Sequence, residues 1–265
     1  MGLRIAFIVL MIGAWPMSAE VREIQSMQEI LAEIDDDTIV FFDIDNTLIM
    51  PVDGLGSDQH FYFIRQRLEE NYKISREEAS KKAEQIWNLS QRKIKTKPVE
   101  LSTPELIANL QKNKAKLFAL TARTFSIADI TREQLWQNGI DFARQSLVTN
   151  EPLIIDDHSV YTQGIVYQGE GNDKGKTLLK FLAMFNLKPK KIVFVDDKEH
   201  NVINVHNALE AIGIRHIEYR YAATDKAVYD FIAQSSSAEF MSKADLFQMT
   251  LLEELSFKIH ELNAP

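Results

Sequence analysis

Two aspartates separated by one residue, Asp43 and Asp45, follow the apolar run 39–42, and the hydroxyl of Thr47 lies two positions further on. A short run of β-branched and aromatic residues is typical of a buried strand, so both carboxylates are expected at a buried strand end. Burying carboxylates costs several kcal/mol unless a cation or strong donors compensate. A divalent metal ion is the natural compensator for two charges this close, so the spacing predicts a metal site.

Two further apolar runs also end in polar side chains. The run 116–120 ends at Thr121, and the run 191–195 ends at Asp196 and Asp197. In an open parallel sheet, binding sites form outside the carboxyl ends of the strands. The polar residues at the three strand ends are therefore expected to converge at one edge of a sheet.

The segments between these runs alternate strand with helix. A leading amphipathic helix is expected over 22–34, and a final amphipathic helix after the serines at 235–237. Apolar periodicity further predicts a hairpin within 153–168, a strand over 214–219, and helices over 126–138, 173–185, 199–212 and 224–233. Such alternation predicts a parallel sheet with helices on both faces.

Residues 57–114 interrupt this alternation with a helical pattern. Ser75 and Glu78 fit a capping box, and Ser102 with Pro104 fits a cap followed by proline in the first turn. We therefore expect a helical insertion over 57–114 with no strand of its own. The core domain is then built from 20–56 and 115–265, which is long enough to bury a sizeable core.

The first 19 residues have the layout of a signal peptide. Arg4 precedes the apolar run 5–12, and the small pair Ser18-Ala19 predicts cleavage after Ala19. The alternatives are a membrane anchor and a buried first helix, but the run is shorter than the ~20 residues that a spanning helix needs. The expectation is an exported protein, periplasmic or secreted, with no stable membrane anchor once the signal is removed.

Composition excludes several functional classes. The net charge of −8 gives no electrostatic footprint for nucleic acid or for an anionic membrane. The chain contains no cysteine, which excludes disulfides, thiolate metal sites and cysteine nucleophiles. The oligomeric state does not follow from the sequence.

The polar residues at the strand ends resemble the four motifs of the haloacid dehalogenase (HAD) superfamily, phosphatase type. The match covers most of residues 38–220 and consists of Asp43-x-Asp45-x-Thr47, Thr121, a lysine at a helix start, and Asp196-Asp197. The segments Leu55-Gly56-Ser57-Asp58-Gln59 and Gly164-Ile165…Lys174-Gly175 are similar to a poorly characterised branch of exported bacterial HAD-like proteins. The resemblance implies a three-layer, Rossmann-like α/β core with a helical cap inserted between the first and second motifs.

The same resemblance implies a Mg²⁺-dependent phosphatase that hydrolyses a small phosphate monoester. Asp43 would be the nucleophile that forms an aspartyl-phosphate, and Asp45 would act first as general acid and then as general base. Thr121 and Lys174 would bind the phosphoryl group. The magnesium ligands would be Asp43, Asp45 through its backbone carbonyl, Asp196 and Asp197.

Several alternatives stay open at this point. Lys176 or another nearby lysine could replace Lys174. Arg123 is expected in a surface salt bridge, and contact with a substrate phosphate is the alternative. Asn201 is either a helix-surface residue or a helper of the metal site, and the histidines show no ligand spacing. The aromatic residues 61–63 are expected to pack in the core by default, and the alternative is that they line the pocket.

Two other functional classes compete with the phosphatase. Residues 170–177 nearly form a nucleotide-binding P-loop, but Glu170 stands where that motif needs glycine. A HAD-fold protein that binds metal or phosphate without turnover is the second, because a fold does not guarantee activity.

Overall fold

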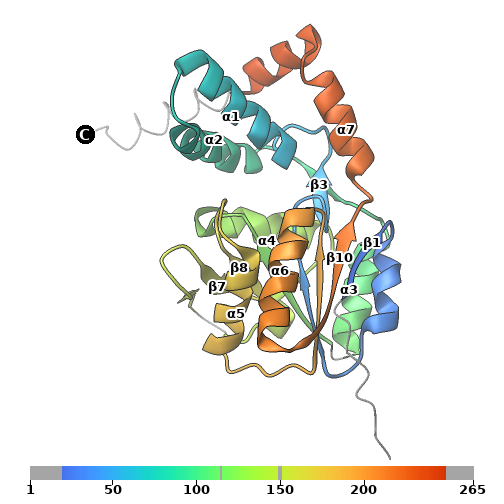
Figure 1. Cartoon of the computed structure of the whole chain (residues 1–265). Coiled ribbons are helices and arrows are strands. Elements are labelled where there is room, and N and C mark those ends of the chain that lie inside the picture. Colours follow the sequence, from blue (N-terminus) through green and yellow to red (C-terminus); the bar gives the residue numbers. More distant parts are fainter. Residues whose placement is uncertain (1–19, 114, 149–150, 249–265) are drawn as a thin grey trace, which may run out of the picture.

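A sheet of eight strands forms the centre of the molecule (Figure 1). The computed structural model describes residues 20–113, 115–148 and 151–248. The strand order is β1-β10-β9-β2-β5-β8-β7-β6, parallel from β1 to β8 and antiparallel at β7 and β6. The strands are β1 (Glu20–Ile24), β2 (Thr38–Phe42), β5 (Lys116–Thr121), β6 (Leu153–Ile154), β7 (Val160–Thr162), β8 (Ile165–Tyr167), β9 (Lys191–Asp196) and β10 (Arg215–Tyr221).

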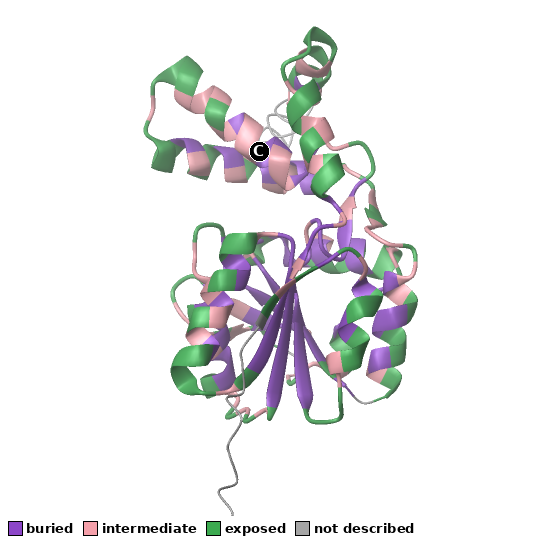
Figure 2. Cartoon of the chain, turned by 45° about the vertical axis from the view of Figure 1, so that its right-hand side comes forward, coloured by how far each residue is buried: buried purple, intermediate pink, exposed green. Residues whose placement is uncertain are grey.

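Each face of the sheet buries one half of the strand side chains. In β2, Val40 and Phe42 lie in the apolar cluster on one face, and Ile39 and Phe41 in the cluster on the other. Both sets are buried, as expected for a parallel sheet covered on both sides. Figure 2 shows the central strands of the sheet buried, whereas exposed residues occur in the edge strand β1. The continuous apolar runs of the sequence follow from this double burial.

Helices cover both faces. On one side lie α3 (Thr103–Lys112), α4 (Ala128–Gln137) and the short 3₁₀ segment η1 (Met27–Glu33). On the other lie α5 (Lys174–Met184) and α6 (Glu199–Ile212). The predicted three-layer, Rossmann-like α/β architecture with a mainly parallel sheet is therefore confirmed.

A pair of antiparallel helices stands above the carboxyl ends of the strands (Figure 1). These are α1 (Asp58–Tyr72) and α2 (Arg76–Gln91), and Ser57 and Ser75 cap them by accepting bonds from the backbone N–H groups of His60 and Glu78. Two short strands, β3 (Ile49–Pro51) and β4 (Thr96–Pro98), pair at the base of the helical pair. The expectation that 57–114 contains no strand is therefore wrong, because β4 lies within it.

The packing also differs from the expected division into core and insertion at two places. Helix α3 belongs to the core layer, since Leu106, Ile107 and Leu110 share one cluster with the strands. Conversely, α7 (Asp225–Gln234) and the helical residues 238–248 leave the core and pack on α1. Length and amphipathicity predicted these helices but did not indicate which surface they would cover.

The prediction of an N-terminal helix over 22–34 is also wrong. Residues 20–24 form the edge strand β1, which pairs in parallel with β10, and only 27–33 are helical, as η1. Ser26 and Glu29 form a capping box at the start of η1, which separates it from the strand. The predicted signal peptide, residues 1–19, lies outside the described residues. No helix within the described ranges combines the length and apolar composition that a membrane crossing requires.

Candidate functional site

Three carboxylates gather where β2 and β9 end. Asp43, Asp196 and Asp197 each offer an oxygen, and these oxygens lie within 4.8 Å of one another. The two strand ends are joined by a bond of 2.8 Å from the backbone N–H of Asp43 to the carbonyl of Val195. All three aspartates are buried. The convergence expected from the parallel topology is therefore present.

Lys174 provides the positive charge at the centre of this group. It is the first residue of α5, and its fully buried Nζ donates to Asp43 Oδ1 and, over 2.7 Å, to Asp196 Oδ2. Lys176, the alternative at this position, is exposed. Gly175 lets α5 approach α6 closely, because a Cβ there would lie 2.2 Å from the carbonyl oxygen of Asn204. Of the two lysines, Lys174 is the one that faces the carboxylates.

Asp196 accepts hydrogen bonds from three residues. Besides Lys174, it accepts a bond of 2.8 Å from the backbone N–H of Lys198. The amide of Asn201 donates to both of its oxygens, each over 3.1 Å. Asn201 is itself buried, which rules out the alternative of a residue on the helix surface, and its amide holds the Asp196 carboxylate in place.

Burial and mutual repulsion disfavour a full set of charges here. Burial raises the pKa of Asp43 to about 7, against the opposing effect of Lys174, and Asp196 and Asp45 add to the rise. Burial also raises the pKa of Asp197, helped by Asp196 and Asp43. Burial lowers the pKa of Lys174, but its two aspartate partners outweigh this and raise it above its usual value. Three carboxylates beside one lysine therefore need protons or a further cation to balance their charge.

The residues present fit a divalent cation of the magnesium type. Asp197 Oδ1 is buried without a hydrogen-bond partner among the described residues. Its backbone N–H is fixed by Thr47 Oγ1 at 3.1 Å, and Asn46 reaches its other oxygen over 3.4 Å from a left-handed turn with φ of 61°. Carboxylate oxygens are the ligands that Mg²⁺ prefers. The motif residues after β2 thus hold Asp197 in a position where an ion could use its free oxygen.

Asp45 has a different partner from the other aspartates. Arg123 donates to both of its oxygens, with Nε–Oδ2 and Nη2–Oδ1 distances of 2.8 Å. Arg123 is 3% exposed, and its Nη1 also donates to Thr131 and Gln134. The prediction of a surface salt bridge for Arg123 is therefore wrong, because its guanidinium is buried beside the strand ends and Asp45 is only 13% exposed.

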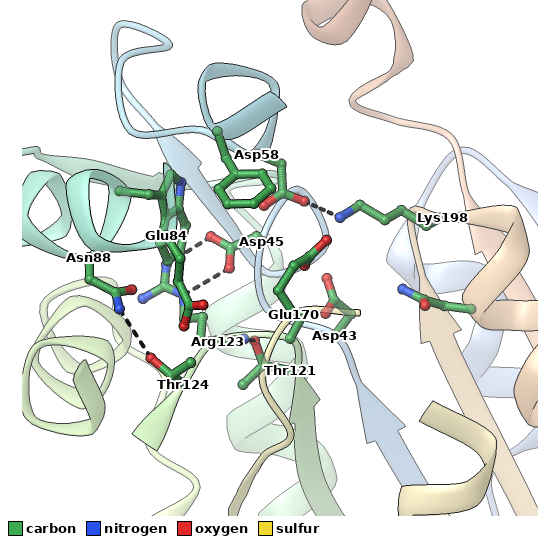
Figure 3. A pocket seen from close by; sticks show the side chains of 14 residues that line it. Asp43, Asp45, Asp58, Glu84, Asn88, Thr121, Arg123, Thr124, Glu170 and Lys198 are labelled. Carbon is green, nitrogen blue, oxygen red and sulfur yellow. Dashed lines mark hydrogen bonds and ion pairs between the residues drawn. The ribbon is translucent and has the colours of Figure 1, made fainter. Parts of the chain in front are cut away.

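Thr121 lies at the end of β5, next to this ion pair. Its Oγ1 accepts a bond of 3.1 Å from the backbone N–H of Arg123, so it shapes the turn that follows the strand. Asp43, Asp45 and Thr121 line one pocket, which encloses about 490 Å³ together with its opening to solvent. In Figure 3, Asp58 of α1 lies above Asp45, and Asp43 and Thr121 lie below Asp45.

The helical pair supplies the upper wall of this pocket. Asp58 and Phe61 come from α1, and Glu84, Trp87 and Asn88 from α2 (Figure 3). Phe61 also packs in the small apolar cluster between the helices, so it has both roles considered for the aromatic run.

Several polar contacts cross from the pocket's helical wall to the sheet edge. Lys198, directly after Asp197, forms an ion pair with Asp58 and donates to Tyr62 Oη over 3.3 Å. Asn88 donates to Thr124 Oγ1 over 3.2 Å. Sequence reasoning missed Asp58, Lys198 and Glu84. The position of Lys198 next to an acidic motif was the one available signal, since nothing in the sequence shows which helix face turns toward the sheet.

Comparisons with known proteins place the chain among bacterial relatives. It is 25% identical over 230 residues to a Chlamydia trachomatis protein named "Putative outer membrane protein", covering 84% of this chain and 85% of the relative. It is 25% identical over 207 residues to an uncharacterized protein of Rickettsia prowazekii, covering 74% and 73%. Among solved structures, a haloacid dehalogenase-like hydrolase of Streptococcus pneumoniae matches 74% of this chain and all of its own, with 14% identity and a TM-score of 0.42. The family model that matches residues 21–255 carries the description "Protein of unknown function (DUF2608)", and the chain belongs to this family.

Proposed function

We propose that this protein is a Mg²⁺-dependent phosphatase that hydrolyses a small phosphate monoester through an aspartyl-phosphate on Asp43. The observation that carries the proposal is the buried lysine of α5, whose Nζ joins Asp43 to Asp196 at the edge of a pocket that also holds Asp45 and Thr121. A nucleophilic carboxylate, a second carboxylate beside it and a cation for phosphoryl oxygens are the groups that this chemistry needs.

In the first step, an oxygen of Asp43 attacks phosphorus and the bond from phosphorus to the leaving oxygen breaks. Lys174 donates to Oδ1 of Asp43, and no described residue donates to Oδ2. The second oxygen is therefore available for attack, while Lys174 fixes the carboxylate and offsets charge on the incoming phosphoryl group. Thr121 and the backbone after it would bind phosphoryl oxygens.

Asp45 would move the protons. It would protonate the leaving oxygen and later take a proton from the water that attacks the aspartyl-phosphate, which releases phosphate and restores Asp43. In the described geometry Arg123 occupies both Asp45 oxygens, an arrangement that holds the carboxylate form in place for the water-activation step. For the acid step, one oxygen of Asp45 must turn from Arg123 toward the pocket.

Asp43, Asp196 and Asp197 would hold the magnesium ion, together with the backbone carbonyl of Asp45. When bound, the ion supplies charge neutralisation for the phosphoryl oxygens. Residues Asp58, Phe61, Glu84 and Trp87 would exclude bulk water and limit the size of the substrate.

The place of action that we propose is outside the cytoplasm, in the periplasm or beyond the cell. The predicted signal peptide supports this, as does the name "outer membrane protein" that Chlamydia relatives carry. The N-terminal residue of protein recovered from cells checks it: a mature chain beginning at Glu20 is expected, and an uncleaved Met1 would contradict export by this route.

The deciding experiment is hydrolysis of an aryl phosphate by the purified protein. Activity is expected with Mg²⁺, is expected to vanish with EDTA, and should fall by roughly a thousandfold or more in Asp43→Asn. Asp36→Asn, an exposed aspartate in a turn, is the matched control and should keep full activity.

The other outcomes separate the alternatives. Metal-dependent hydrolysis that survives Asp43→Asn would sink the aspartyl-phosphate mechanism. A folded protein that binds Mg²⁺ and turns over no member of a phosphate-ester panel would assign the binding role instead.

A further inference from the structure

A second group of metal-binding side chains lies between α6 and β10. His206 comes from α6, and His216 and Glu218 come from β10, with ligand atoms within 4.8 Å of one another. Positions 216 and 218 share one face of the strand because strand side chains alternate. The register pairs Glu218 with Phe194, two residues before Asp196, so the group lies below the carboxyl-end site.

The carboxylate of Glu218 is the centre of this group. It is completely buried, and the Nδ1 atoms of His206 and His216 face its two oxygens at 2.9 Å and 2.7 Å. A buried carboxylate with no other partner among the described residues depends on these imidazoles for compensation. Burial raises the pKa of Glu218, while both imidazoles act in the opposite direction.

A neutral His216 ring cannot donate hydrogen bonds to both of the carboxylates that face it. Its Nδ1 faces Glu218, and its Nε2 faces Glu210 Oε2 at 3.3 Å. A neutral imidazole has one donor and one acceptor nitrogen, whereas both partners here accept. A second proton on the ring, a proton on the buried Glu218 carboxylate, or a metal ion at Nδ1 would each resolve this arrangement. With a metal at Nδ1, the proton stays on Nε2 and is donated to Glu210, which is the outer-shell arrangement usual for metal-bound histidines.

We propose that His206, His216 and Glu218 form a Zn²⁺ site, with Glu210 as the residue that orients His216. Two imidazoles and a carboxylate are a typical zinc ligand set, and water would complete four-coordination. Zinc bonds of roughly 2.0–2.2 Å in a tetrahedron separate ligand atoms by about 3.3 Å. The observed distances of 2.7–2.9 Å therefore need a shift of about half an ångström in each pair. Rotation of the part-exposed His206 can provide it for the pair with Glu218 Oε2, and a side-chain rotation of His216 or Glu218 has to provide it for the other pair.

A zinc ion could reach the group from solvent past His206 and Glu210. Side-chain exposure is 26% for His206 and 65% for Glu210, whereas His216 and Glu218 form the buried floor. A bound ion would join α6 to the sheet. Since ligands that bind only the folded state stabilise it, zinc is expected to raise the melting temperature.

The test is calorimetric titration of Zn²⁺ into the metal-stripped purified protein, with Mg²⁺ in excess to occupy the aspartate site. One tight zinc equivalent is expected. His206→Gln should weaken its affinity tenfold or more, because glutamine can still donate to Glu218 but is a poor zinc ligand. Glu210→Gln should weaken it by roughly tenfold through loss of the orienting carboxylate.

The control is His158→Gln, since His158 is an exposed histidine in a loop outside the group. The control variant should bind zinc with the affinity of the unsubstituted protein, and zinc should raise the melting temperature of both. In His206→Gln the zinc-dependent rise in melting temperature should be smaller. Zinc affinity that is unchanged in His206→Gln would overturn the proposal. The proposal would also be overturned if the protein took up no zinc and the NMR spectrum showed His216 protonated on both ring nitrogens, because a proton would then occupy the position proposed for the metal.

Discussion

At the scale of single residues, Lys174 and Lys176 are two positions apart in the chain but are expected to contribute very differently to the free energy of unfolding. Lys174 is 0% exposed and pairs with Asp43 and Asp196, whereas Lys176 is exposed. Breaking a buried ion pair by removing one partner is strongly destabilising, because the other charge stays buried without compensation. Lys174→Met is therefore expected to lower the free energy of unfolding by about 3–5 kcal/mol in EDTA. Lys176→Met should change it by less than about 0.5 kcal/mol. Urea unfolding of both variants measures the difference, and equal losses would contradict the buried role of Lys174.

Sequence patterns located the acidic residues of the site but not the partners that hold them. Asp43, Thr121 and Asp196 follow apolar runs, and parallel topology then requires their strand ends to meet. Arg123 carried no comparable signal. Its partner Asp45 is 78 residues away, and a charged residue is usually exposed unless it is paired, so the surface was the natural expectation.

At the scale of elements, the start of α1 contains a titratable group that links folding to pH. His60 is buried, its Nδ1 accepts a bond of 3.0 Å from the backbone N–H of Gly56, and burial lowers its pKa to about 4, against a smaller opposite effect of Asp53. In the unfolded chain its pKa is about 6.5. Between these values the unfolded state binds more protons, so stability falls as pH drops from about 6.5 toward 4.

The expected size of this effect is about 2 kcal/mol between pH 7 and pH 5. Urea unfolding at the two pH values measures it, and His60→Gln isolates it from the titration of carboxylates. The variant should lose less stability on acidification than the unsubstituted protein. Parallel losses in the two proteins would show that His60 does not stay neutral in the folded state.

The wrong sequence predictions at this scale have physical reasons. Residues 20–24 carry an apolar pattern short enough for a strand or a helix, and pairing with β10 decides for the strand. The strand β4 contains Lys97 and Pro98 and has no periodicity of its own, because its pairing with β3 at the base of α1 and α2 defines it. Long periodic helices such as α5 and α6 were predictable because their apolar faces repeat over several turns.

At the scale of the whole molecule, two segments far apart in the chain, α1–α2 and α7 with the helical residues 238–248, form the helical body above the sheet. Phe63 of α1 packs edge-on against Phe231 of α7 and Phe240 of the following helix, with ring centroids 6.5 Å and 5.5 Å away. Arg67 forms an ion pair with Asp245. The sequence predicted these helices separately, but their association depends on tertiary packing between residues more than 160 positions apart.

This arrangement predicts that α1 and α2 can loosen without unfolding of the sheet. Phe231→Ala removes the ring that packs on Phe63 and Gly54, whereas Tyr229→Ala, on the same helix, removes an exposed ring. Hydrogen exchange in α1 and α7 is expected to become faster in Phe231→Ala and to stay unchanged in Tyr229→Ala. Because β2, β5 and β9 are buried by other helices, their amides should keep their protection in both variants. If exchange rises equally in the strands, the sheet and the helices above it unfold as one cooperative unit. If exchange in α1 is unchanged, the C-terminal helices do not hold α1 in place.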